Sequence, residues 1–150
     1  MSMTKHEAIA EALHSQGYSC SQAVLAAFSD VAGLDQALLL KISAGLGGGM
    51  ADLHEVCGAV TSAILALDLI YAEGAPSKMR RAQNDYPRLR EIANAFREIN
   101  GSIVCRELLG IEDAERTRPA GKTCHDMVCD AARLVDEYIE ACPVEGYGKN

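Results

Sequence analysis

The sequence predicts an all-α protein, a compact helical bundle around a buried central helix at about residues 56–72. Apolar residues recur at helical spacing in several segments, and no segment alternates convincingly as a strand. Pairs of polar residues three apart, typical of helix starts, precede several of these segments. The 150 residues include no tryptophan, so small and aliphatic side chains must build the core, which favours closely packed helices. We expect one helical domain over 1–150.

The first part of the chain predicts three helices. Residues 4–16 form an amphipathic helix that Gly17 stops. Ser19 and Gln22 have the spacing of a capping box and predict the start of the second helix. The third helix covers residues 35–44. Its expected inward side chains are Leu38, Leu39 and Ile42.

The central helix follows a glycine-rich turn at residues 45–49. Glycines allow a tight turn and a close approach to a neighbouring segment. Asp52 and Glu55 have capping-box spacing, which predicts a helix that begins at about Leu53. Nearly every residue over 56–67 is apolar or small, so we expect this helix to be surrounded by protein.

The second part of the chain predicts a charged helix, a short helix, a loop and a last helix. The charged helix covers 78–100, and Pro87 either kinks it or begins its second half. The short helix precedes a polar loop at 111–122, the best candidate for a mobile segment. A capping box that starts at Thr123 predicts the last helix, which runs to about Ala141.

Charge and hydropathy exclude two classes of partner. A formal net charge of −7 argues against nucleic acid, because phosphate binding needs a basic surface. The longest apolar run is too short to span a bilayer, and the N-terminal residues lack the apolar core of a signal peptide. We therefore expect a cytoplasmic protein without membrane or nucleic-acid partners. Its many alanine- and leucine-rich faces favour self-association as a homodimer.

The chain has six cysteines. Structural disulfides are uncommon in a reducing cytosol, so clustered cysteines there more often bind metals or take part in redox chemistry. Cys20 and Cys124 occupy the first position after a helix cap, and Cys105 and Cys57 lie in early turns of their predicted helices. Unpaired N–H groups at helix starts favour a thiolate and lower the pKa of a cysteine. We expect these four thiols to form one site, although cysteine also packs as a small apolar residue.

Other motifs carry weaker signals. His54 and His125 lie near Cys57 and Cys124 and could extend a metal shell, but histidines in such positions are more often surface residues. The chain has no C-x-x-C pair, which argues against covalently attached c-type haem. The glycine turn lacks the lysine of a phosphate-binding loop, so nucleotide binding is not predicted.

Five segments together resemble the C_GCAxxG_C_C family of small bacterial and archaeal proteins, in the family's order. They are GYSCSQAVL (17–25), GLGGGM (45–50), VCGAVTSAILAL (56–67), CRELLG (105–110) and CHDMV (124–128). The resemblance implies that the family's four cysteines are Cys20, Cys57, Cys105 and Cys124, in a helical domain with a redox or metal function. The resemblance also implies a relation to domains found in some haem proteins, and it implies no substrate. One departure is Ser62, where the family pattern has glycine, and we expect a looser helix contact there.

The first hypothesis is therefore redox chemistry by the four clustered cysteines, through thiol–disulfide exchange with a redox partner protein or through electron transfer. The second is that the same four thiolates hold zinc or an iron–sulfur cluster. The third is a structural or partner-binding helical domain. Whether the protein is an enzyme stays open at this point. Cys129 and Cys142 should lie outside the cluster, and replacing either by serine should leave metal content or redox behaviour nearly intact.

Overall fold

The computed structural model describes residues 2–144, and these residues form helices joined by loops, without a sheet. The predicted all-α class is confirmed. The helices are α1 (Lys5–Ser15), α2 (Cys20–Ala26), α3 (Ser29–Ala32), α4 (Gln36–Ser43), α5 (Gly58–Tyr71), α6 (Lys78–Arg80), α7 (Tyr86–Asn100), α8 (Cys105–Leu109) and α9 (Cys124–Ala141). A 3₁₀ turn, η1 (Ala44–Leu46), follows α4, and a π-helical turn, η2 (Arg81–Asp85), precedes α7.

Polar caps fix where three of the helices begin. Ser19 and Thr123 form the predicted capping boxes at the starts of α2 and α9, and Thr4 forms another at the start of α1. In each box the cap side chain accepts a hydrogen bond from a backbone N–H that would otherwise lack a partner. The caps therefore place Cys20 and Cys124 at the first helical position, as the sequence predicted.

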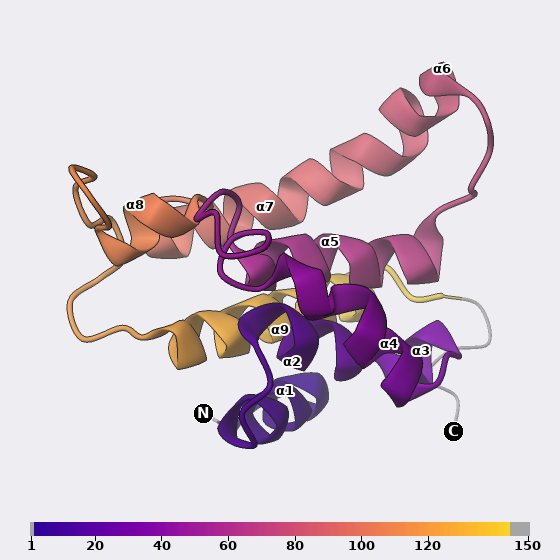
Figure 1. Ribbon diagram of the computed structural model, residues 1–150. Helices are drawn as coiled ribbons and strands as arrows, with labels where there is room; N and C mark the ends of the chain where they lie inside the picture. The colour runs from indigo at the N-terminus through magenta and orange to yellow at the C-terminus, as the bar shows by residue number, and fades with distance from the viewer. Residues whose placement is uncertain (1, 145–150) are drawn as a thin grey trace.

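Helix α5 crosses the middle of the molecule and packs against α2, α7 and α9 (Figure 1). Its buried side chains are mostly small, so these neighbours approach closely. The helix begins at Gly58, later than both Leu53, the start expected from the capping box, and residue 56, the expected start of the buried helix. It is not enclosed along its whole length, because Leu69 is 41% exposed. The prediction of a buried central helix is confirmed for its N-terminal part.

Ser62 lies at the contact between α5 and α2 and is fully buried. Its Oγ donates a hydrogen bond to the carbonyl oxygen of Ser21, at 2.7 Å. The contact that the sequence predicted to be looser is thus a hydrogen-bonded one. The hydroxyl of Ser62 fits beside the neighbouring backbone, and the buried O–H has a hydrogen-bond partner there.

The predicted capping box of Asp52 and Glu55 is wrong. Helix α5 starts at Gly58, its N-cap is Cys57, and no side chain caps it. Asp52 instead has φ +58°, in the left-handed region, where it cannot begin a right-handed helix. The glycines before it set this path, since Gly48 and Gly49 also have positive φ.

The predicted inward face of α4 is also wrong in part. Leu39 is fully buried as expected, but Leu38 and Ile42 are 45% and 51% exposed. Ser43 takes the inward position, and its Oγ donates to the carbonyl oxygen of Leu39. Because residues four apart share a helix face, the pair of Leu39 and Ser43 defines the buried side and rotates Leu38 and Ile42 toward the surface.

Pro87 begins the second half of the charged segment, which was one of its two predicted roles. It is the second residue of α7, and the π-helical turn η2 comes directly before that helix. A proline ring crowds the carbonyl four residues earlier in a regular helix, and the wider π turn relieves that contact. None of the helices formed by residues 2–144 combines the length and apolar content needed to cross a membrane.

A buried histidine joins the N-terminal helix to α9 and α3. The side chain of His6 is 4% exposed, with Nδ1 2.5 Å from Asp136 and Nε2 2.8 Å from Asp30. Its ring also stacks on Phe28. Burial lowers the pKa of His6, but the hydrogen bonds and charges of the two carboxylates outweigh burial, so the net pKa is raised.

Candidate functional site: a cavity lined by four cysteines

One cavity of about 220 Å³ lies at the end of the bundle where α5, α8 and α9 begin. Cys20, Cys57, Cys105 and Cys124 all line it. Cys57 and Cys105 are buried, and Cys20 and Cys124 are partly buried. The remaining lining residues are His14, Ser19, Gly48, Gly49, Gly58, Leu108, Leu109 and Met127. The structure thus brings together the four cysteines that the sequence singled out, and we call this space the cysteine cavity.

Two of the four cysteines are held by backbone pairing between distant segments. The backbone N–H of Cys57 donates to the carbonyl of Ile103, and that of Cys105 donates to the carbonyl of Glu55. An antiparallel bridge between Val56 and Val104 lies between these bonds. This short ladder places the start of α5 beside the start of α8, in the region of Figure 1 where α8 meets the loop before α5. Cys57 and Cys105 therefore face one cavity although 47 residues separate them.

Two glycines are needed for the sulfurs to fit. A Cβ on Gly58 would lie 2.8 Å from the sulfur of Cys20, and one on Gly49 would lie 2.7 Å from Cβ of Cys105. Contacts this short do not occur between real side chains, so any other residue would displace a cysteine. The predicted role of the glycine turn, close packing, is what Gly49 provides.

The turn between Gly49 and Cys57 is conformationally strained. Met50, Ala51, Asp52 and His54 all have φ between +49° and +69°. A left-handed conformation costs a non-glycine residue roughly 1–2 kcal/mol. Hydrogen bonds hold it in place, including those from the N–H groups of His54 and Glu55 to glycine carbonyls of the turn. Strain of this kind is typical of functional sites.

The expectation that helix starts lower the thiol pKa is wrong for three of the four cysteines. The pKa of Cys57 is raised to about 12, mainly by burial, and the charges of Cys20 and Cys105 contribute to this rise. Burial also raises the pKa of Cys105 to about 11 and that of Cys20 above its usual value. Backbone N–H groups do oppose the shift, those of Ala59 and Val60 at Cys57, but desolvation is the larger effect. Cys20, Cys57 and Cys105 are therefore protonated at neutral pH.

The two histidines considered from the sequence have different surroundings. His54 lies beside the cavity, with Nδ1 3.7 Å from the sulfur of Cys105 and Nε2 3.9 Å from Asp52. His125 does not line the cavity and instead contacts His14, whose Nδ1 lies 3.0 Å from its own Nδ1. Burial lowers the pKa of His14, and His125 lowers it further. His14, which does line the cavity, was missed from the sequence because nothing near it in the chain marks a site.

Cys129 and Cys142 are not among the lining residues of the cysteine cavity, in agreement with their predicted positions. Cys129 lies on α9 five residues after Cys124 and is partly buried. Cys142 ends that helix and is exposed. The glycine-containing tail expected after it lies outside the described residues.

Most of the chain matches a known protein family. The model of the family described as "Putative redox-active protein (C_GCAxxG_C_C)" matches residues 18–138. The chain belongs to this family. The searches of the curated proteins and of the solved structures each found no match.

The C_GCAxxG_C_C pattern acquires a physical meaning in this structure. The glycine after Cys57 is Gly58, whose missing side chain leaves room for the sulfur of Cys20. The matched region includes all four lining cysteines and both glycines that contact them. A cavity of this kind can form a disulfide between neighbouring thiols, or it can offer sulfur atoms to a metal ion or cluster.

Proposed function

We propose that this C_GCAxxG_C_C protein is a redox protein whose active group is built on the sulfurs of Cys20, Cys57, Cys105 and Cys124. One observation carries the proposal: four cysteines from four separate segments line one small cavity. Two thiols would suffice for a disulfide, and a single buried cysteine needs no neighbour for packing. A set of four around one space matches the donor set of a metal or iron–sulfur site.

The raised thiol pKa values favour ligation over thiol attack. A protonated thiol is a poor nucleophile, and a pKa of about 12 leaves Cys57 almost entirely protonated at neutral pH. A bound metal cation changes this balance, because a coordinating thiol loses its proton. We therefore propose ligation of an iron–sulfur cluster as the first mode, with zinc as the alternative occupant. A cluster would supply one-electron transfer when bound.

The chain's own residues fit such a group in three ways. The four cysteines supply sulfur, and the rest of the lining is mostly apolar, with leucine and methionine side chains that limit the access of water. Burial raises the pKa of Cys20, and the backbone N–H groups of Gly48 and Ser21 oppose this rise. Donors of this kind stabilise negative sulfur, and they tune the potential of a sulfur-ligated cluster.

A dithiol mode is the second candidate, because Cys20, Cys57 and Cys105 line the same cavity. In this mode two thiols of the cavity would give up two protons and two electrons and form one S–S bond. A disulfide in a redox partner protein would accept them and become two thiols. We propose a cytoplasmic setting, where thiols are kept reduced between cycles.

Anaerobic purification, followed by absorbance, metal and sulfide analysis and thiol counting, tests the proposal. A brown protein with iron and acid-labile sulfide supports the cluster. A colourless protein with one zinc, or one that loses two thiols on oxidation, supports the alternatives. Cys57→Ser or Cys124→Ser should abolish the cluster, the zinc bound in the cysteine cavity or the cavity disulfide, and Cys142→Ser should not. A folded protein without metal, whose cavity thiols do not oxidise to a disulfide, would refute the redox proposal.

A further inference from the structure

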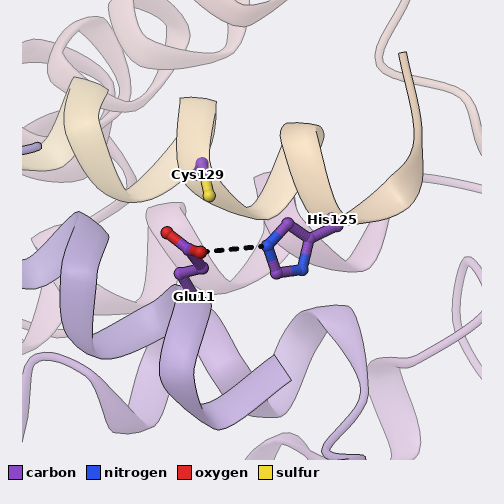
Figure 2. A group of neighbouring side chains, drawn as sticks. All are labelled: Glu11, His125 and Cys129. Carbon is purple, nitrogen blue, oxygen red and sulfur yellow. Dashed lines mark ion pairs between the residues drawn. The ribbon is translucent and has the colours of Figure 1, made fainter. Parts of the chain in front are cut away.

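A second cluster of metal-ligating side chains lies between α1 and α9, outside the cysteine cavity. Glu11 comes from α1, and His125 and Cys129 come from α9 (Figure 2). One ligand atom of each residue lies within 4.8 Å of those of the other two. A carboxylate oxygen, an imidazole nitrogen and a thiol sulfur are all ligands of zinc and related divalent metals.

Helix geometry accounts for the convergence. His125 and Cys129 are four residues apart, so their side chains lie one above the other on the same face of α9. That face packs along α1, where Glu11 and His14 are three residues apart and also share a face. The cluster is thus carried by two regular helices, which fix side chains more tightly than loops do.

The orientation of the His125 ring suits a metal ligand. Its Nδ1 lies 3.0 Å from Nδ1 of His14, so one proton is shared between these two atoms. When that proton is on His125, the Nε2 lone pair is free and points toward Glu11. Metal-bound histidines ordinarily donate their other N–H in this manner, which fixes the ring and its tautomer.

The spacing of the two ligand atoms also suits an ion between them. The Nε2 of His125 lies 3.6 Å from Oε1 of Glu11, which is too long for a direct N–H···O hydrogen bond. Two ligand atoms that are each roughly 2.0–2.1 Å from a tetrahedral zinc are about 3.4 Å apart. The observed separation is close to this value, so a small movement would complete the site.

We propose that Glu11, His125 and Cys129 bind one divalent transition-metal ion, and that His14 positions His125 for it. Three protein ligands leave the fourth position of a tetrahedral ion to water or a small donor molecule. On binding, the sulfur of Cys129 bonds to the metal and its proton passes to solvent.

This site shares no ligand with the cysteine cavity, so evidence for or against metal binding here does not decide the redox proposal. It also changes one prediction from the sequence. Replacing Cys129 should leave the contents of the cysteine cavity intact, as expected, but it should remove a separate ion. The side chains of Glu11 and His125 are 39% and 35% exposed, so added metal can reach the site from solvent.

Zinc titration by calorimetry, on reduced and chelator-treated protein, tests the site. Cys129→Ala should lose one zinc equivalent or bind it on the order of 100-fold more weakly, because a direct ligand matters at least as much as an outer partner. His14→Ala removes the partner of His125 and also a side chain that lines the cysteine cavity, and it should weaken the same equivalent roughly 10–100-fold. Cys142→Ala is the matched control, a cysteine at the exposed end of the same helix, and should match the wild type.

Two further variants keep the test decisive. Glu11→Gln changes a partly exposed residue and preserves folding even if Cys129→Ala does not, which circular dichroism checks. Cys57→Ser removes a ligand of the cysteine cavity and should retain the zinc equivalent that depends on Cys129. The proposal is overturned if Glu11→Gln binds zinc with the stoichiometry and affinity of Cys142→Ala, or if Cys57→Ser abolishes all zinc binding while the protein stays folded.

Discussion

Replacing Gly58 by alanine tests whether the cysteine cavity needs a helix start without a side chain. The added Cβ would lie 2.7 Å from the carbonyl oxygen of Leu46 and 2.8 Å from the sulfur of Cys20. The sulfur can move, but the carbonyl belongs to the backbone of η1 and cannot easily give way. We therefore expect the substitution to displace Cys20 and to strain the turn before α5.

The expected change in the free energy of unfolding for Gly58→Ala follows from two opposing effects. Overpacking a closely packed site costs about 1–3 kcal/mol. Alanine favours a helix over glycine by about 0.5–1 kcal/mol, which offsets part of this cost at Gly58. We expect a net loss of about 1–2 kcal/mol. With a urea dependence of about 2 kcal/mol per molar, the midpoint of unfolding should fall by about 0.5–1 M.

Urea unfolding followed by circular dichroism measures the effect, with Gly45→Ala as the matched control. Gly45 lies in the glycine-rich turn that precedes α5, but a Cβ there meets no atom within 4 Å, and its φ is not positive. The control should unfold within about ±0.5 kcal/mol of the wild type. Equal midpoints for Gly58→Ala and Gly45→Ala, with unchanged metal content and thiol chemistry in both, would refute this account of the glycine.

Three other predictions concern pH, thiol reactivity and assembly. The raised pKa of His6 means that its charged pairing stabilises the fold fully below pH 6.5 and less as the pH rises through the raised value. The lowered pKa of Asp136 means that its contribution is present above 3.8 and is lost as the pH falls further. Asp136→Asn should therefore destabilise the protein most between about pH 5 and 6.5. Chemical denaturation at several pH values measures this effect. A loss of stability that does not change with pH contradicts the prediction. Iodoacetamide labelling of the reduced, metal-free protein at pH 7.5 can be followed by mass spectrometry. The exposed Cys142 should be modified long before Cys57, because burial raises the pKa of Cys57 to about 12. Rapid labelling of Cys57 would show that burial does not control its reactivity. A two-fold homodimer remains our prediction for the assembly, and light scattering over a wide concentration range measures it; a constant monomer mass rejects it.

The fold class and the grouping of the cysteines could be predicted because both depend on local signals. Ser19 and Thr123 sit just before apolar helical stripes, and a cap fixes the position of the next residue to within one place. That is enough to put Cys20 and Cys124 at helix starts. The spacing does not show which helix ends meet. The expectation of one site rested on the shared placement of the four cysteines at helix starts, and the family resemblance picked out the same four residues.

The errors have a common cause, since each concerns a property set by distant parts of the chain. Asp52 and Glu55 have capping-box spacing, but hydrogen bonds to the preceding glycines and to the segment before α8 hold this stretch in a left-handed turn. The thiol pKa values depend on how much protein surrounds each sulfur, and a sequence does not show that depth. The cluster of Glu11, His125 and Cys129 joins two ends of the chain and becomes visible only when α1 lies along α9.

The wide separation of the cavity cysteines along the chain has a thermodynamic consequence. Cys20 and Cys124 are about 100 residues apart, and Cys57 and Cys105 lie between them. Any bond network through these sulfurs closes long loops in the unfolded polypeptide and lowers its entropy. For one loop of about 100 residues the chain-entropy model gives about 4.7 kcal/mol of stabilisation. If the sulfurs hold a cluster or a disulfide, as we propose, loss of that group removes this stabilisation, and the emptied, reduced chain should be the form most easily unfolded and degraded.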